Sequence, residues 1–386
     1  MTLAAHVRNG NLAAPAPPSV LAEFVKPADV VFNGERPWDI RVHNADAYHQ
    51  IMRRGSLGFG ESYVNGDWDS EQLDETFTRL LKADLNHKLA GLARLKFAVE
   101  RVRSYLLNLQ SRSRAFQVGE QHYDIGNEVF EAMLDRTMSY SCGYWKDTGT
   151  LEQAQLAKLR LICEKLQLEA GQRLLDIGCG WGGLARYAAK NYAVEVYGIT
   201  VSRQQAALAK ERCGGLPVNI ELRDYRELQG RFDRVVSVGM FEHVGVKNYS
   251  TYFDMVDKVL DPQGLFLLHT IGDHKSTGIG DAWLDKYIFP NGSLPSASHI
   301  TAAFEDQWVL LDWHNFGPDY SRTLKAWWEN FENAWPRLRD RYGERFYRMW
   351  KYYLLSFIGF FNSNQGQLWQ MVFCKRGRQA LYRSIR

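Results

Sequence analysis

Short apolar runs alternate with amphipathic stretches throughout the second half of this chain. Runs of strand length lie at 173–177, 194–200, 218–223, 234–238 and 264–270, and we expect a helix after each of the first four. Two further strands are predicted at 308–316 and 368–375. Strands that alternate with helices form a parallel sheet covered on both faces. The pattern therefore predicts an α/β fold with a seven-stranded, Rossmann-like sheet.

The first 85 residues follow a different pattern. Residues 1–20 are rich in Ala and Pro and are expected to form a disordered leader. Residues 21–85 should form a smaller N-terminal domain, with strands at 28–32 and 38–42, a helix from Ala45, and turns at 55–63, where glycines recur. No catalytic grouping is visible in this domain, which favours a scaffold or an interaction module.

Residues 86–115 have apolar positions at helical spacing and a marked basic excess. Between Lys88 and Arg114 there are seven Lys or Arg residues and a single acid, Glu100. A linker helix with a solvated basic face explains this pattern. A basic amphipathic surface that meets anionic lipid headgroups explains it as well, and contact with RNA is a third reading. Residues 116–386 should form the larger domain, where any catalytic residues are expected.

Composition narrows the class of protein. The 386 residues are 45% apolar and 24% charged, which is ordinary for a globular protein, and the net charge of +3 is too small to indicate nucleic acid by itself. The five cysteines form no C-x-x-C pair, which argues against a disulfide framework and a zinc site and for a reducing compartment. Since no signal peptide or membrane span is visible, a cytoplasmic location is expected.

A glycine-dense turn follows the strand at 173–177. The run Leu174-Leu-Asp-Ile-Gly-Cys-Gly-Trp-Gly-Gly183 places Asp176 before Gly178 and Gly180. Glycine lets the backbone turn sharply and leaves bare main chain against a ligand. The turn resembles the first motif of S-adenosylmethionine (SAM) dependent methyltransferases, and its D-x-G-x-G spacing differs from the dinucleotide motif. An ordinary strand–turn–helix junction is the bland alternative.

The other strand ends supply polar partners for such a cofactor. Many enzymes of this class have an acid after the second strand, whereas this chain offers Thr200, Gln204 and Gln205. After the third strand, Asp224 and Tyr225 either contact adenine or form a surface turn. Two more groups are candidates for a catalytic role. Glu242 and His243 form a Glu–His pair after the fourth strand, and His269 lies in the fifth strand.

Aromatic residues are concentrated near the C-terminus. Residues 313–361 include 16 aromatics, about one third of the positions, compared with 13% in the whole chain. A helical core explains the excess. An apolar tunnel for a long acyl chain, whose rings can stabilise a cation, explains it equally well.

Several motifs together resemble the family of cyclopropane and mycolic acid synthases, to which bacterial cyclopropane-fatty-acyl-phospholipid synthases belong. The similarity extends from about residue 28 to Phe373. The motifs are Gly119-Glu-Gln-His-Tyr-Asp-Ile-Gly-Asn127, Tyr140-Ser-Cys-Gly-Tyr-Trp145, the turn at 175–183, Gly239-Met-Phe-Glu-His-Val-Gly245, His269-Thr-Ile-Gly272, Tyr287-Ile-Phe-Pro-Asn-Gly292 and Asp312-Trp-His-Asn-Phe-Gly317.

The resemblance implies transfer of the SAM methyl carbon to a cis double bond in a membrane phospholipid, with bicarbonate as the base. It also implies a homodimer, peripheral binding to the inner face of the membrane, and no nucleic-acid partner. The bicarbonate pocket would comprise Cys142, Glu242, His269, Ile271 and Tyr320. SAM would be held by Tyr140, Ser141, the 174–182 loop with Asp176, Gly178 and Gly180, then Thr200, Gln204, Gln205, Asp224 and Tyr225.

Alternatives remain open beside this interpretation. The same chemistry could end in a methyl-branched chain, and a small-molecule or RNA methyltransferase or a non-catalytic SAM-binding membrane module are further classes. One departure from the family pattern matters. The family often has a cysteine shortly after a Tyr-Tyr-Leu run, whereas this chain reads Tyr352-Tyr-Leu-Leu-Ser356, and Cys374 lies far along the chain. We therefore expect no covalent thiol catalysis.

Overall fold

The structure, a computed structural model, describes residues 15–85, 126–276 and 280–386. Most of the predicted leader, the whole basic segment 86–115 and residues 119–125 of the first family motif lie outside these ranges. The predicted leader is too long, because helix α1 (Ser19–Val25) begins inside it and buries Leu21 and Val25. Apolar residues at these two positions give the segment a face to pack.

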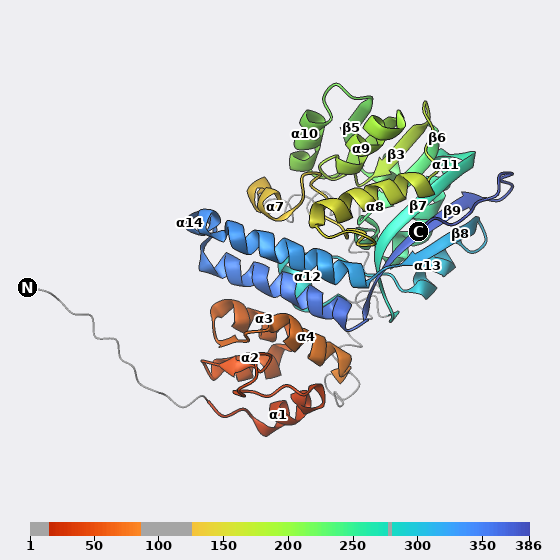
Figure 1. Ribbon diagram of the computed structural model, residues 1–386. Coiled ribbons are helices and arrows are strands. Elements are labelled where there is room, and N and C mark those ends of the chain that lie inside the picture. The colour runs from red at the N-terminus through yellow and green to blue at the C-terminus, as the bar shows by residue number, and fades with distance from the viewer. Residues whose placement is uncertain (1–14, 86–125, 277–279) are drawn as a thin grey trace, which may run out of the picture.

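A seven-stranded mixed sheet lies at the centre of the larger part of the molecule, as predicted (Figure 1). The strand order is β5-β4-β3-β6-β7-β9-β8, and all pairs are parallel except those that β9 makes with β7 and β8. The strands are β3 (Arg173–Ile177), β4 (Glu195–Thr200), β5 (Val218–Leu222), β6 (Phe232–Val238), β7 (Leu260–Asp273), β8 (Trp308–Asn315) and β9 (Gly366–Lys375).

Neighbouring apolar residues of each strand point to opposite faces of this sheet. Leu174 and Val236 join the core on one face, whereas Leu175 and Val235 join the core on the other. The first face is covered by α8 (Leu151–Lys165), α9 (Gly183–Tyr192) and α10 (Arg203–Arg212), and the second by α11 (Tyr249–Val259) and α13 (Ala297–Phe304). Continuous apolar runs therefore mark strands that are buried on both sides.

One predicted helix is missing from this half. The strand β5 is followed only by a three-residue 3₁₀ turn, η3 (Tyr225–Glu227), before β6 begins. Asp224 starts this turn, since its carboxylate accepts the backbone N–H of Arg226 at 2.9 Å. A second short pair of turns, η4 (Phe241–His243) and η5 (Val246–Asn248), leads from β6 into α11.

The N-terminal unit is mainly helical: of the two predicted strands, 28–32 is absent and 38–42 is shortened to β1 (Arg41–Val42). Residues 26–28 form a 3₁₀ turn, and Phe32 and Ile40 share only one isolated bridge. The reason is Asp39, whose carboxylate accepts the N–H groups of Val31 and Arg36, so side-chain bonds replace a ladder. The remaining elements are η1 (Lys26–Ala28), β1 (Arg41–Val42), α2 (Asp46–Arg54), α3 (Ser56–Asn65), β2 (Trp68–Asp69) and α4 (Leu73–Lys82).

The glycine-rich segment 55–63 is not a series of turns, and that prediction is wrong. Only Gly55 has a positive φ, at 58°, while the rest belongs to α3. A Cβ at Gly58 would lie 2.0 Å from the carbonyl oxygen of Gln50, and one at Gly60 would lie 2.4 Å from the ring of Trp283. These glycines therefore allow close packing rather than chain reversal.

A long helical hairpin connects the two parts of the molecule. Helix α14 (Pro318–Asn362) is interrupted at Gly343, where φ is 73°, and its two arms lie between the N-terminal helices and the sheet (Figure 1). It contacts α3, α4 and α7 (Asn127–Met133), and its aromatic side chains are part of one core with residues of the N-terminal unit. The aromatic excess at 313–361 thus includes a helical core. Helix α12 (Ala282–Tyr287) packs beside α3.

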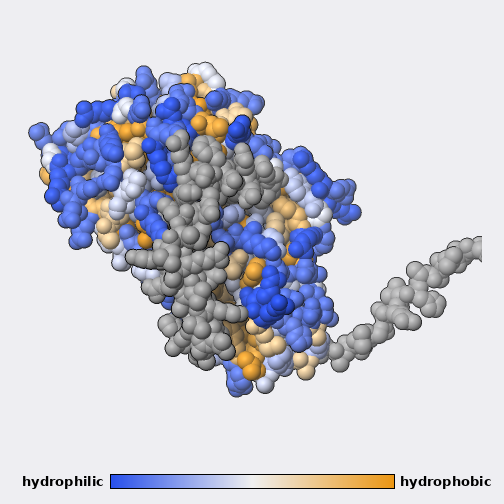
Figure 2. Space-filling model, turned by 180° about the vertical axis from the view of Figure 1, so that it is seen from behind, coloured by the Kyte–Doolittle hydropathy of each residue, from blue (hydrophilic) through white to orange (hydrophobic). Residues whose placement is uncertain are grey.

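Along the described ranges, no helix is both long enough and apolar enough to span a bilayer. From behind, apolar residues form separate patches among hydrophilic ones (Figure 2).

Candidate active site

The glycine turn after β3 presents bare backbone at the carboxyl end of the sheet. The N–H groups of Gly178 and Cys179 both donate to the carbonyl of Ile199 at 2.9 Å, which ties the turn to β4. Gly178 has a φ of 86°, and a Cβ there would lie 2.7 Å from Cβ of Met240. Only glycine satisfies both the conformation and the space. The turn can therefore receive a ligand against its main chain.

Asp176 lies at the end of β3 immediately before this turn. The residue is buried, and its Oδ2 has no hydrogen-bond partner among the described residues. Burial raises the pKa of Asp176 to about 7, and the charge of Lys158 acts in the opposite direction. A buried carboxyl oxygen without a partner calls for a donor, and the ammonium group of an amino-acid ligand would provide one. The residue therefore fits the methionine part of SAM.

The residues after β4 and β5 are organised by local caps. Thr200 donates to Oε1 of Gln205 at 2.8 Å, and Ser202 caps α10 by accepting the N–H of Gln205. Gln205 is buried, whereas Gln204 is exposed. Asp224 is buried and paired with Arg226 at 2.9 Å, and the ring of Tyr225 packs at 5.2 Å from Tyr252. Local contacts therefore fix these side chains, and their binding of the cofactor stays a prediction.

The segment 138–145 folds across the strand ends and joins them to α14. The hydroxyl of Tyr140 lies 2.7 Å from that of Tyr353, and the backbone N–H of Trp145 donates to Asp319 at 2.7 Å. A Cβ at Gly239, just after β6, would lie 3.9 Å from Cβ of Ser141. Tyr140 and Ser141 therefore connect the strand ends to the aromatic hairpin, and we call segment 138–145 the lid.

Glu242 and Ile271 are in direct contact. The backbone N–H of Ile271 on β7 donates to Oε1 of Glu242 at 2.7 Å, while Oε2 has no partner among the described residues. Burial raises the pKa of Glu242 to about 6, against the stabilising effect of the Ile271 hydrogen bond. The ring of the neighbouring His243 instead lies 6.3 Å from that of Phe289. Glu242 is thus the member of the predicted Glu–His pair that contacts β7, and its chemical role stays a prediction.

His269 lies on β7 opposite Gln370 of β9. The amide nitrogen of Gln370 lies 3.2 Å from Nδ1 of His269. This NH₂ group is a donor, so Nδ1 accepts and the ring proton is on Nε2. Burial holds the pKa of His269 well below its usual range, with help from the charges of Lys158 and Lys165. A neutral ring therefore presents an N–H at Nε2, which has no partner among the described residues.

Cys142 and Tyr320 lie where segment 138–145 meets α14. The Cys142 thiol is fully buried, 3.7 Å from the hydroxyl of Thr323, which is one helical turn from Tyr320 on α14. Burial raises the pKa of Cys142 well above its usual value, so the thiol is protonated. The Phe316 ring lies 5.9 Å from the ring of His269 and 5.4 Å from that of Tyr144, two residues after Cys142. Ser356 ends the run 352–356, after which the family often has a cysteine, and its hydroxyl donates to the Tyr353 carbonyl at 2.9 Å.

Sequence reasoning missed three residues that support this site. Gln370 fixes the tautomer of His269, Thr323 holds the lid at Cys142 and Trp145, and Lys158 donates to Ser141. Gln370 is the polar residue in the buried, otherwise apolar run 368–374 of β9, and this interruption could have pointed to it. Lys158 and Thr323 lie on helices, where their polar character looked ordinary.

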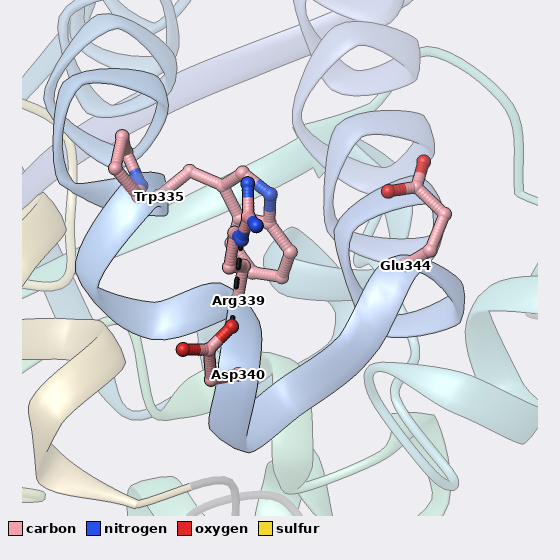
Figure 3. Close-up of a pocket in the computed structure, with 5 residues that line it drawn as sticks. Trp335, Arg339, Asp340 and Glu344 are labelled. Carbon is pink, nitrogen blue, oxygen red and sulfur yellow. Dashed lines mark hydrogen bonds and ion pairs between the residues drawn. The ribbon is translucent and has the colours of Figure 1, made fainter. Parts of the chain in front are cut away.

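A hollow at the tip of the α14 hairpin lies away from these residues. It is lined by Trp335 and Arg339 from one arm and Glu344 from the other, with Asp340 paired to Arg339 (Figure 3). All of its described lining belongs to α14, and none of it comes from the strand ends. We do not assign the site to it.

The fold and the turn define a Rossmann-like, SAM-dependent methyltransferase. A family model described as mycolic acid cyclopropane synthetase matches residues 110–371. The chain is 53% identical over 353 residues to a cyclopropane-fatty-acyl-phospholipid synthase of Escherichia coli (strain K12), with 92% of each chain covered. It therefore belongs to the mycolic acid cyclopropane synthetase family.

The similar proteins include enzymes that are named for other activities. A tuberculostearic acid methyltransferase of Mycobacterium tuberculosis is 32% identical over 87% of this chain and 83% of its own. The structure of a cyclopropane synthase from Mycobacterium tuberculosis matches with a TM-score of 0.65 at 30% identity, covering 70% of this chain and all of that one. Coclaurine N-methyltransferase, at 22% identity and a TM-score of 0.68 over 82% of this chain and 98% of its own, is similar in fold alone.

Replacement of Gln370 by Leu should lower kcat roughly 10- to 100-fold, the range typical of lost support for a functional histidine. The reason is that His269 loses the donor that fixes its proton on Nε2. Affinity for S-adenosylhomocysteine (SAH) should not change, which calorimetry checks. Gln367→Leu on the same strand is the control, since Gln367 bonds to Trp369 and Asn315 instead. Equal losses in both variants would contradict this role of Gln370.

Proposed function

We propose that this protein transfers the methyl carbon of SAM to the cis double bond of an unsaturated phospholipid acyl chain and closes a cyclopropane ring. The observation that carries the chemistry is the pair of buried polar atoms at the strand ends, Glu242 Oε2 and His269 Nε2, beside the bare glycine turn. An acceptor and a donor without partners form a receptor for a small protonated anion. We infer that this anion is bicarbonate, which supplies a base when bound.

The donor half of the site comprises the turn with Gly178 and Gly180, Asp176 and the lid residues Tyr140 and Ser141. An alkene is a weak nucleophile, so the methyl carbon must be held in line and at close range. The glycine turn on one side and the lid on the other would hold the methyl donor in this position. Thr200, Gln204, Gln205, Asp224 and Tyr225 would hold the nucleoside part.

The base half must remove a proton from the added methyl carbon so that the ring can close. In the proposed pocket, His269 donates through Nε2 and Glu242 accepts through Oε2, so the two orient the base. Ile271 contributes its amide, which holds Glu242 at 2.7 Å. Cys142 and Tyr320 would close the pocket from the lid and from α14. With a protonated, buried thiol, Cys142 serves as a wall and not as a nucleophile.

The aromatic hairpin would keep the reacting carbons dry. Attack by the alkene leaves a positive charge on the acyl chain, which water would quench. The Tyr320 ring stacks on Phe361 at 4.5 Å, and the Tyr140 ring lies 5.3 Å from Trp327. Faces of such rings stabilise a cation without reacting with it. We infer that the acyl chain enters along these rings.

The reaction is tested by incubating the protein with SAM and vesicles of unsaturated phospholipid. The lipid should gain the mass of one CH₂ group, lose its alkene signal and show cyclopropane protons by NMR. Survival of the alkene would refute the proposal. A methyl-branched product would favour the second candidate, which the 32% identical tuberculostearic acid methyltransferase supports. Removing bicarbonate from the buffer should lower turnover at least tenfold, and adding it back should restore the rate.

We further propose that the protein works at the inner face of the membrane as a homodimer, with the N-terminal unit in the dimer contact. The lipid substrate and the basic segment 86–115 support binding to anionic headgroups. Co-sedimentation with anionic and neutral vesicles tests the membrane part, and RNA gel shift tests the alternative partner. Sedimentation velocity tests the dimer.

A further inference from the structure

Lys158 is a buried cation that the chemistry above does not use. It lies on α8 with a side chain that is almost fully buried, and burial lowers its pKa to about 8. Its Nζ makes one hydrogen bond within the described ranges, to Oγ of Ser141 at 2.9 Å, and the described ion pairs do not include it. A lysine ammonium has three donors. Two of them therefore remain for a ligand in a place where an unpaired charge is costly.

A second buried lysine on the same helix shows what an internal pairing looks like. Lys165 lies two turns further along α8, and its Nζ is 3.1 Å from Oδ2 of Asp312, with both side chains inaccessible. Asp312 is also held by Arg386 at 2.6 Å. Lys165 thus has an anion in direct contact, whereas Lys158 contacts only the hydroxyl of a lid residue among the described residues. The charge of Asp135 also acts on Lys158, but the Asp135 carboxylate accepts the backbone N–H groups of Thr137 and Ser139 instead.

The Ser141 hydroxyl is oriented by this lysine. Because an ammonium can only donate, Oγ of Ser141 accepts from Lys158, and the hydroxyl hydrogen must point elsewhere. Ser141 lies across from Gly239 at the strand ends, and Asp176, whose Oδ2 lacks a partner, is among the charges that act on Lys158. An anionic acceptor, Asp176, and a cationic donor, Lys158, therefore act on each other at this end of the sheet.

We propose that Lys158, together with the Ser141 hydroxyl that it orients, recognises the α-carboxylate of SAM, while Asp176 receives the α-ammonium group. The amino-acid part of SAM is a zwitterion, so its negative carboxylate would meet the cation Lys158 and its positive ammonium group would meet Asp176. The assignment rests on SAM being the methyl donor and is independent of the ring chemistry. Lys158 is a binding residue for the cofactor, distinct from the base pocket.

The test compares two ligands by calorimetry on the full chain: SAH and decarboxylated SAH, which lacks only the carboxylate. The wild-type protein should prefer SAH by roughly 10- to 100-fold, as expected for a charge-assisted hydrogen bond. Lys158→Met should reduce this preference to about threefold or less, and decarboxylated SAH should bind as tightly as before. Lys165→Met, the matched control on the same helix, should keep the wild-type preference.

Three results would overturn the proposal. Equal weakening of both ligands in Lys158→Met would make the lysine a structural residue. An unchanged preference with a higher bicarbonate requirement would assign its charge to the base pocket. If Lys158→Met does not fold, Ser141→Ala decides, because it removes only the oriented hydroxyl: a reduced preference supports the assignment and an unchanged preference refutes it. Since SAH binding is measured directly, a failure of cyclopropane formation leaves this test unaffected.

Discussion

Glu242→Gln is expected to stop product formation while raising the stability of the protein at neutral pH. The Gln side chain keeps an oxygen for the Ile271 N–H but replaces the second oxygen with a donor, so the acceptor in the base pocket is lost. Loss of an acid–base partner typically costs 100-fold or more in rate. SAH affinity should stay within about twofold of wild type, because Glu242 belongs to the base half of the site.

The gain in stability follows from the pKa of Glu242. Burial raises this pKa from 4.5 to about 6, so the folded protein binds the proton more tightly than the unfolded chain. The stability from this group is therefore fully present below pH 4.5 and is lost as the pH rises through 6. Above that range the ionised carboxylate destabilises the fold by about 2 kcal/mol, and the Gln variant avoids this cost.

Denaturant unfolding of both proteins across this pH range measures the effect. The difference in free energy of unfolding should be small below pH 4.5 and should grow in favour of the variant above pH 6. Glu305→Gln, at an exposed position after α13, is the control and should show neither the activity loss nor the pH-dependent gain. A Gln variant that is active, or less stable than wild type at pH 7.5, would contradict the assignment.

Gly178→Ala should abolish SAM binding while the protein stays folded. The added Cβ would lie 2.7 Å from Met240 in a residue whose φ is 86°, so the turn must move away from the ligand. We expect at least a 100-fold loss of SAH affinity by calorimetry, since backbone contacts to the ligand depend on this turn.

Gly215→Ala separates the effect of backbone strain from the effect of the collision with Met240. Gly215 has a φ of 76° and is exposed, with no atom within 4 Å of an added Cβ. It therefore has the same conformational strain, roughly 1 kcal/mol, without the collision. SAH affinity should be that of wild type in this control. Equal affinity losses in both variants would show that strain alone accounts for the effect, and the proposed close approach of ligand and backbone would be wrong.

The strands of the sheet could be predicted because their residues bury on both faces. Runs such as 173–177 and 264–270 leave no polar face, and this pattern is local to each strand. The N-terminal unit was less predictable, since Gly58 and Gly60 have their role only against Gln50 and Trp283, which the sequence does not place beside them. A glycine needed for packing and a glycine needed for a turn look alike in a sequence.

The same distinction applies to the site. Asp176 and Glu242 lie at or just after strand ends, and His269 lies near the end of the predicted strand 264–270, so the rule for strand ends predicts them. Gln370 could not be found in this way, because β9 enters the sheet between β7 and β8 in the antiparallel sense and its register depends on the α14 hairpin that precedes it. Lys158 can be recognised as a site residue only from its contact with Ser141 of the lid, and no local sequence pattern predicts that contact.

Two consecutive tyrosines of α14 face opposite parts of the molecule. Tyr352 packs against Phe77 at 5.1 Å and Trp283 at 4.4 Å, on the side of the N-terminal unit, while the Tyr353 hydroxyl lies 2.7 Å from that of Tyr140 in the lid. Loss of packing below the hairpin therefore removes the support of the lid above it. We therefore expect the lid and the N-terminal unit to unfold as one cooperative unit in denaturant.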